Sequence, residues 1–246
     1  MATSRRSTCV ASVLFALLSG SAIAADLPVA PEVVPVSPWY IRGDVGYKFY
    51  SDPNVSFNDP KAKVGSFSHE SIDGTAVIGG GVGYKFSPWF RGDVTFDYEF
   101  PSEFEGRAPC KTCGGKKTYS KEYADVSAFT ALVNGYIDFG TWNSITPYIG
   151  GGVGASNVEI SNYHFKNPNG SRGKWKGDNE WNFAWAATAG LAFAVTESVA
   201  IDVNYRYLSL GDGRTKNIPI GSGKNPVKFE DIAAHEFRVG FRYMFP

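Results

Sequence analysis

The chain has 246 residues, and its 24 basic and 24 acidic side chains give a formal net charge of zero. This balance argues against a nucleic-acid-binding protein, which needs an excess of Lys and Arg on one face. After the apolar run at residues 10–18, the sequence has no segment with the roughly 20 uninterrupted apolar residues that a membrane-spanning helix needs. The 18 Phe, 13 Tyr and 6 Trp instead favour pleated strands.

The N-terminal residues have the pattern of an export signal. Arg5 and Arg6 form a positive start, residues 10–18 form a short apolar core, and residues 22–24 supply small side chains for cleavage. We therefore predict that residues 1–24 are a signal peptide, which removes Cys9. A lipoprotein needs a cysteine directly after the cleavage point, where this chain has Ala25, so a lipid anchor is not expected. Residues 25–38 contain four prolines and predict an extended periplasmic lead-in.

Residues 39–245 alternate apolar and polar side chains in about eight segments, which is the period of a β-strand. The cleanest segment, 89–100, places Phe, Val and Tyr on one face and Arg, Asp and Glu on the other. A strand that is apolar on one face and charged on the other suits a wall between lipid and a polar interior. The predicted strands are 39–50, 75–86, 89–100, 125–139, 145–157, 181–195, 199–207 and 233–245.

The connections between these strands alternate between long and short. Four long external loops are predicted, near residues 51–71, 101–122, 158–179 and 211–231, and the turns between them are short. Outer-membrane barrels show this asymmetry because their periplasmic turns are short and their external loops are long. The sequence therefore predicts an all-β fold: a single antiparallel up-and-down transmembrane barrel of eight strands over residues 39–245, located in the outer membrane.

Charged residues are predicted to fill the interior of this barrel. An eight-stranded barrel is only wide enough for its own side chains, and unpaired buried charges are costly, so we expect an ion-pair network. Its basic and acidic members are equal in number: Arg42, Asp44, Lys48, Lys85, Arg91, Asp93, Asp97, Glu99, Asp138, Asp202, Arg206, Glu236, Arg238 and Arg242. The alternative is a small-solute porin, in which more strands would surround a water-filled channel lined by the same charges.

The strand sequences resemble the small eight-stranded outer-membrane barrels of Gram-negative bacteria, especially the surface proteins of rhizobial and related alphaproteobacteria. The resemblance covers nearly the whole predicted mature chain. It rests on Ala-Asp-Leu-Pro at 25–28, Trp-Tyr-Ile-Arg-Gly-Asp-Val-Gly-Tyr at 39–47, Gly-Gly-Gly-Val-Gly-Tyr at 79–84, Pro-Tyr-Ile-Gly-Gly-Gly-Val-Gly at 147–154 and the aromatic C-terminus.

The resemblance implies a surface protein with a structural, envelope-integrity and interaction role, whose loops offer antigenic surface. It also implies a C-terminal assembly signal, here Phe241, Tyr243 and Phe245, for the barrel-assembly machinery. The family usually ends in Phe, whereas Phe245 is followed by Pro246 in this chain.

The predicted loops hold the other candidate site residues. Cys110 and Cys113 are the two cysteines of the predicted mature chain, and a disulfide that pins the loop is favoured over a redox pair in an oxidising compartment. The basic loop residues suit the phosphates of lipopolysaccharide, although ordinary solvated charge explains them equally well. Outer-membrane lipids and host or environmental surface ligands are the other expected partners, and the oligomeric state stays open.

An outer-membrane enzyme that processes lipids or peptides is the second alternative. Such a site needs a general base beside a nucleophile or an activated water. The chain has only three histidines, His69, His164 and His235, and none has an evident catalytic partner in the sequence. We therefore expect neither catalysis nor a cofactor, and we expect no metal site.

Overall fold

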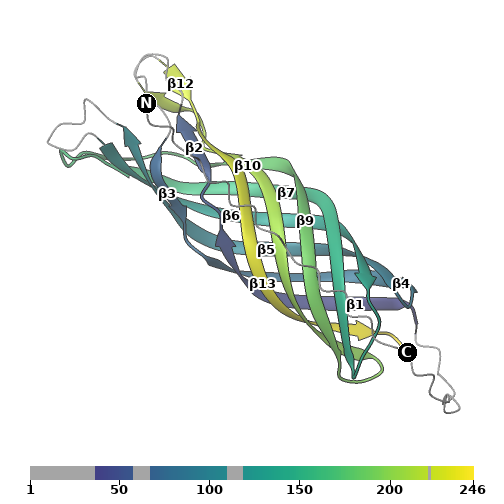
Figure 1. The fold of residues 1–246 in the computed structure, drawn as a ribbon. Helices are drawn as coiled ribbons and strands as arrows, with labels where there is room; N and C mark the ends of the chain where they lie inside the picture. Colours follow the sequence, from purple (N-terminus) through teal and green to yellow (C-terminus); the bar gives the residue numbers. More distant parts are fainter. Residues whose placement is uncertain (1–36, 58–66, 110–118, 221–222) are drawn as a thin grey trace, which may run out of the picture. The chain divides into compact units, whose positions relative to one another are not determined.

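Eight strands form a closed antiparallel barrel in the computed structural model, which describes residues 37–57, 67–109, 119–220 and 223–246 (Figure 1). Each strand pairs with the next along the sheet, and the last pairs back with the first, with Tyr40 opposite Met244. The predicted eight-stranded, all-β, antiparallel fold is confirmed. In order, the strands are β1 (Trp39–Tyr50), β4 (Thr75–Ser87), β5 (Phe90–Pro109), β6 (Tyr119–Asp138), β7 (Ile145–Lys166), β9 (Asp178–Ala194), β10 (Val199–Arg214) and β13 (Val227–Met244).

Some sequence predictions fall on other parts of the chain. The predicted signal peptide, nearly all of the lead-in, and Cys110 and Cys113 lie outside the described residues. Among the described residues, no helix has the length and apolar character to cross a membrane.

The two ends of the barrel differ. Short turns join β4 to β5, β6 to β7 and β9 to β10. Side chains cap two of these turns: Ser87 Oγ accepts a hydrogen bond from Phe90 N at 3.1 Å, and Thr196 Oγ1 accepts one from Val199 N at 3.0 Å. The C-terminus lies at this end (Figure 1). Five short strands complete the other end: β2 (Asn54–Phe57), β3 (Ser68–Ile72), β8 (Arg172–Lys174), β11 (Ile218–Ile220) and β12 (Gly223–Asn225).

The predicted long loops are largely strands. β5 and β6 each have 20 residues and β7 has 22, about twice the 9–11 residues with which a strand crosses a bilayer. β5 continues to Pro109 and β10 to Arg214, while β2, β3 and β8 pair with β13, β5 and β7. The segments 101–122, 158–179 and 211–231, which were predicted as long loops, therefore contain strand residues over much of their described length.

These added strand residues form a second storey of the barrel, which we call the extension. It comprises the strand residues 54–57, 68–72, 101–109, 119–128, 156–166, 172–174, 178–180, 208–214 and 227–234, together with residues 175–177 that join β8 to β9. Its interior is apolar, with Phe104, Val126, Ile160, Leu210 and Phe229 fully buried in one cluster. The rest of the barrel, which we call the belt, has the opposite arrangement, with exposed apolar side chains outside and buried charges inside.

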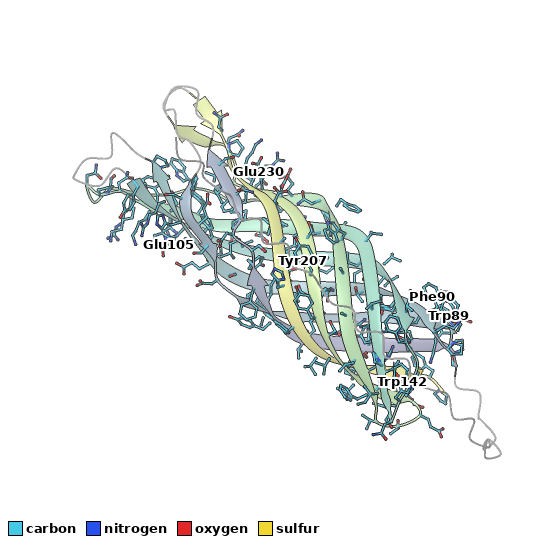
Figure 2. The ribbon with its side chains drawn as sticks, in the orientation of Figure 1. Trp89, Phe90, Glu105, Trp142, Tyr207 and Glu230 are labelled. Carbon is cyan, nitrogen blue, oxygen red and sulfur yellow. The ribbon has the colours of Figure 1, made fainter. Side chains whose placement is uncertain are left out.

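Figure 2 shows the two storeys by their outward side chains. Glu105 and Glu230 lie at the end that carries β2 and β3, whereas Trp89, Phe90 and Trp142 lie at the opposite end. The outward aromatic and aliphatic residues of the belt are widely exposed, for example Trp89 at 62% and Phe237 at 61%. Such a surface is stable only against another apolar medium.

A β-bulge changes which residues of β5 point inward between the belt and the extension. On β5, Phe96, Tyr98 and Phe100 point outward, yet Phe104, which continues the same even-numbered series, is fully buried. The pairing with β6 shifts between Glu99 and Ser102, so one extra residue exchanges the two faces of the strand. A pattern-based reading that expects apolar residues outside cannot detect this exchange, which is why residues 101–109 were predicted to be a loop.

Glu122 is the one carboxylate of β6 that points into the extension. It lies opposite Gly106 on β5 and Phe165 on β7, and it is buried. Burial raises the pKa of the Glu122 carboxyl to about 7, and hydrogen bonds from Ser120 and Tyr163 oppose this effect only in part. The neutral carboxylic acid is therefore the form that suits the folded extension.

Phe104→Ala should destabilise the extension by about 3–5 kcal/mol, the usual cost of emptying a buried phenylalanine site. The Phe104 ring packs edge-on against that of Phe229, with centroids 4.9 Å apart. Hydrogen exchange in lipid vesicles should show faster exchange in the extension and unchanged protection in the belt. Phe183→Ala, the same change at an exposed outward site, is the control. Equal exchange in the two variants would contradict the packed interior.

The extension should lose stability as the pH rises. Glu122 binds its proton with a pKa of about 7 when folded and near the ordinary 4.5 when unfolded. The protonated carboxyl therefore contributes about 3 kcal/mol to the stability of the extension below pH 4.5, and this contribution is lost as the pH rises from 4.5 through about 7. Local unfolding free energies from hydrogen exchange at pH 5 and pH 8 measure this change. Glu122→Gln should abolish it, whereas Glu105→Gln on the outer face should not; an unchanged pH dependence in Glu122→Gln would exclude this carboxyl as the cause.

Candidate functional sites: the lumen and the outer face of the extension

A buried lysine lies at the top of the charged lumen. The Lys48 side chain is fully buried, and its Nζ forms an ion pair with Glu99 and a second one, at 3.0 Å, with Glu236 Oε1. Tyr50 covers the same ammonium with its ring centroid 5.4 Å away and donates its hydroxyl to Glu99 Oε2 at 3.1 Å. These contacts join β1, β5 and β13 across the interior.

Two arginines bind the next pair of carboxylates. Arg206 donates to Asp97 Oδ2 at 2.9 Å and to Glu236 Oε2 at 2.7 Å. Arg238 donates to Asp97 Oδ1 at 2.5 Å and to Glu236 Oε2 at 3.1 Å. Each carboxylate therefore bridges two guanidinium groups, the arrangement in which charge-assisted hydrogen bonds are strongest.

The lower lumen combines arginines with tyrosines. Arg42 donates to Asp44 at 2.7 Å, to Asp93 at 3.0 Å and to the Tyr136 hydroxyl at 2.9 Å. Arg91 pairs with Asp138 at 3.1 Å and lies 4.0 Å from the ring centroid of Tyr136. Flat aromatic faces and planar guanidinium groups stack closely, so these side chains fill the interior.

Glycines on the inner wall leave space for the long side chains that fill the lumen. A Cβ at Gly79 would lie 1.9 Å from Asp97 Oδ1, and a Cβ at Gly152 would lie 2.0 Å from the Asn134 side-chain oxygen. Glycine at these positions leaves room for the long polar side chains that cross from neighbouring strands. The glycine clusters at 79–83 and 150–154 thus provide space for the lumen side chains.

Most of the predicted lumen residues meet inside the belt. Each of the fourteen except Lys85 forms at least one ion pair within 4.0 Å, and Arg242 does so with Asp202 at 3.4 Å. Lys85 forms none with the described residues. It is partly exposed and lies opposite Arg91, a like charge. The sequence reasoning missed Tyr40, Tyr136 and Tyr148, although their inward position in the strand alternation was a usable signal.

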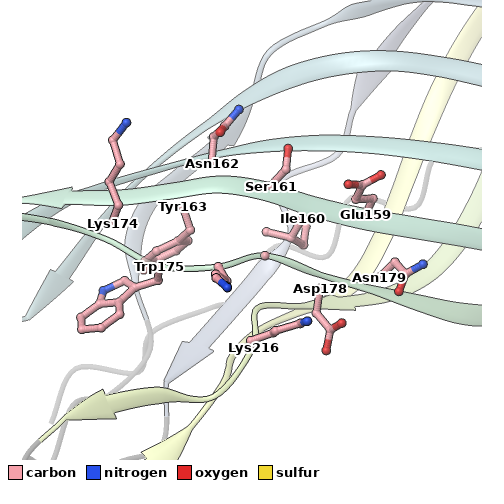
Figure 3. Close-up of a pocket in the computed structure, with 12 residues that line it drawn as sticks. Glu159, Ile160, Ser161, Asn162, Tyr163, Lys174, Trp175, Asp178, Asn179 and Lys216 are labelled. Atoms are coloured by element: carbon pink, nitrogen blue, oxygen red, sulfur yellow. The ribbon is translucent and has the colours of Figure 1, made fainter.

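A hollow of about 540 Å³ lies in the wall of the extension, where the buried Ile160 and Tyr163 also line it. Figure 3 shows its wall: Glu159, Ser161 and Asn162 come from β7, and Trp175 and Asp178 come from the chain that returns beside it. Lys174, Lys176 and Lys216 add positive charge. The neighbouring hollow, about 380 Å³, shares Lys174 and is lined by Tyr123, His164, Phe165, Lys166, Arg172 and Gly173. Cations and aromatic rings together suit an anionic or saccharide ligand.

Two of the predicted assembly residues, Phe241 and Tyr243, lie on β13, and Phe245 directly follows its last residue. Phe241 and Phe245 are exposed on the outer face, and Tyr243 is half-buried there. Their side chains therefore belong to the apolar outer surface of the belt, at the end where the short turns lie (Figure 1). Among the described residues, no cluster of three or more His, Cys, Asp or Glu has the arrangement of a metal site.

Relatives in other bacteria match between 69% and 98% of this chain. An uncharacterized protein of Brucella suis is 29% identical, covering 98% of this chain and 99% of its own. The outer membrane protein PagN of Salmonella typhimurium is 32% identical over 69% of this chain and 73% of its own. A putative adhesin of Rickettsia bellii is 24% identical over 83% of this chain and 87% of its own.

Solved structures and a family model agree with this placement. The outer membrane protein OprG from Pseudomonas aeruginosa has the same fold, with a TM-score of 0.53 at 16% identity over 85% of this chain and 97% of its own. The model of the outer membrane protein beta-barrel domain matches residues 11–245. The belt therefore faces the lipid of an outer membrane, and this chain is a member of the outer-membrane protein β-barrel domain family.

Proposed function

We propose that this protein is a surface-attachment protein of the outer membrane with a closed lumen, and that it also supports envelope integrity. The observation that carries the proposal is the extension, a strand-built platform beyond the lipid. A 20-residue strand such as β5, tilted by about 40°, rises about 50 Å along the barrel axis, compared with roughly 30 Å for the hydrocarbon core. The platform therefore stands well clear of the membrane surface.

The packing of the extension suits recognition. Its interior is apolar and buried, so its outer side chains are held on a rigid wall rather than on irregular loops. That wall carries charged and aromatic groups around two hollows. The relative in Rickettsia bellii bears the name putative adhesin, and kinship with it supports attachment as the role of this platform.

The lumen supports a closed barrel rather than the porin alternative. Asp97, Glu99 and Glu236 are each at most 1% exposed and are paired with buried cations. Above them, Phe104 and Phe229 pack ring against ring in the extension. A conducted solute would have to break these ion pairs and then pass an apolar layer, so the proposed role does not include conduction.

Two partner assignments and one disulfide belong to the same proposal. Phe241, Tyr243 and Phe245 would be read by the barrel-assembly machinery during insertion. Lipopolysaccharide would contact the outer face of the extension, because it surrounds every protein of this leaflet. A disulfide between Cys110 and Cys113 would brace the tip that joins β5 to β6; mass measurement with and without reductant tests it.

Lys48→Met should lower the free energy of unfolding by about 3–5 kcal/mol, because it leaves the buried Glu99 carboxylate without a cation and removes one of the three cations that pair with Glu236. Urea unfolding in lipid vesicles measures the change. Lys85→Met is the matched control, since Lys85 forms no ion pair with the described residues, and it should stay within about 0.5 kcal/mol of the parent. Equal stabilities of the two variants would mean that the lumen network contributes nothing to folding.

Expression in a non-adherent Gram-negative strain should increase bacterial attachment to host cells or coated surfaces over an empty-vector control. Surface amount is matched with an antibody against an added tag. The purified protein in a planar bilayer should show no channel openings, because its lumen is filled. Attachment equal to that of the empty vector, together with steady conductance or added solute uptake, would replace the attachment role with the porin alternative.

A further inference from the structure

Four basic residues lie side by side across four strands on the outer face of the extension. In the strand register, Arg107 of β5 is opposite Lys121 of β6, Lys121 is opposite Lys166 of β7, and Lys166 is opposite Arg172 of β8. Opposite residues of paired strands project from the same face of a sheet. We call this set the cationic row; strand spacing gives it a length of about 14 Å.

The side chains of the row are largely uncompensated. Lys121 pairs with Glu105 at 3.2 Å, and this hydrogen bond is the first cause of the raised pKa of Lys121. Arg107 lies over the ring of Tyr119, at 5.0 Å from its centroid. Within the described part of the chain, no carboxylate lies within 4.0 Å of Arg107, Lys166 or Arg172. Like charges opposite one another destabilise a sheet, and a bound polyanion would offset that cost.

A tight hairpin between β7 and β8 fixes the positions of two of the four residues of the row, Lys166 and Arg172. Asn167 N donates to Ser171 O at 2.9 Å, and Asn169 Oδ1 accepts hydrogen bonds from Ser171 N at 3.0 Å and Ser171 Oγ at 2.7 Å. Gly170 supplies the left-handed backbone, with φ of 87°. Lys166 and Arg172 are therefore held next to each other by the turn between β7 and β8 rather than by chance contact.

An aromatic pair lies directly beside the row. Tyr123 is opposite His164 on the neighbouring register position, and their rings stack with centroids 5.1 Å apart and an angle of 17°. Both rings line the hollow that also contains Lys166, Arg172 and Lys174. Flat rings offer an apolar face to a sugar, while the cations bind charged substituents. This combination suits a phosphorylated saccharide better than a bare phosphate.

The position of the row indicates where that saccharide comes from. Phe129 is the last exposed aromatic residue of β6 before the extension, and Lys121 lies about 20 Å above it along the barrel axis. The row faces sideways from the barrel wall. At that height, the space beside an outer-membrane barrel is occupied by the sugars of lipopolysaccharide in the same leaflet.

We infer that the cationic row, with Tyr123 and His164, binds the phosphorylated saccharide of neighbouring lipopolysaccharide molecules. This inference rests on the proposed lipopolysaccharide contact and assigns it to four strands of one side of the extension. The row anchors the rigid platform laterally in the saccharide layer and leaves its tip free for attachment.

The test uses the full chain in nanodiscs of synthetic phosphatidylcholine, with fluorescent, delipidated core oligosaccharide of lipopolysaccharide as the probe. Lys166→Gln/Arg172→Gln should weaken binding at least tenfold, and removing the phosphates from the probe should weaken wild-type binding to a similar degree. Arg214→Gln/Lys228→Gln is the matched control, because it removes the same charge from an opposed pair on β10 and β13 and should bind like wild type. Tyr123→Ala should lose affinity for the oligosaccharide but keep affinity for inorganic polyphosphate.

Each other outcome has a definite meaning. If wild type binds the oligosaccharide and Lys166→Gln/Arg172→Gln binds it equally well, the lipopolysaccharide contact stands but the row is not its site. If wild type does not bind it at all, the proposed lipopolysaccharide contact fails together with the row. If wild type binds only a soluble sulfated polysaccharide and the row variant loses that binding, the ligand is external, and the assignment to the same leaflet is wrong.

Discussion

The wall of this barrel must match a different medium at each height, and the rest of the structure follows from that constraint. Beside lipid, the outer side chains are apolar and the charges turn inward, where they can exist only as paired groups. Beyond the lipid, water accepts the charges outside, and the apolar side chains turn inward to form the cluster around Phe104 and Phe229. The strands continue without interruption through this exchange, so one sheet has two opposite polarities.

The interior of the belt shows why pairing has to be nearly complete. Lys48 lies between Glu99 and Glu236, and Asp97 lies between Arg206 and Arg238, so each charge has more than one opposite neighbour. Such a network need not be more stable than an apolar filling. It does specify which side chains cross the interior, because a one-residue slip of any strand would leave charges in lipid. The same rigidity carries into the extension and holds its outer surface in place.

Much of the belt was predictable from the sequence, whereas most of the extension was not. The strict alternation of residues 89–100 determines which face meets lipid, and the equal numbers of inward acidic and basic residues are enough to indicate an ion-pair network. The extension escapes this reasoning because the bulge between Glu99 and Ser102 reverses the faces of β5. The cationic row was also out of reach, since Arg107, Lys121, Lys166 and Arg172 are distant in sequence and only the strand register makes them neighbours. The inward positions of Tyr40 and Tyr136 could have been predicted from the alternation of inward and outward residues along their strands.

The bulge on β5 also indicates where the length of this chain can vary in evolution. Three residue steps of β5, from Glu99 to Ser102, lie beside two steps of β6, from Ala128 to Val126. Loss of one residue at position 100 or 101 would therefore give a regular ladder that keeps Phe104 inside the extension. Loss of one residue between Asp93 and Asp97 would instead turn Asp97 and Glu99 toward the lipid. Related sequences are therefore expected to differ by a single residue in this strand only beside the bulge.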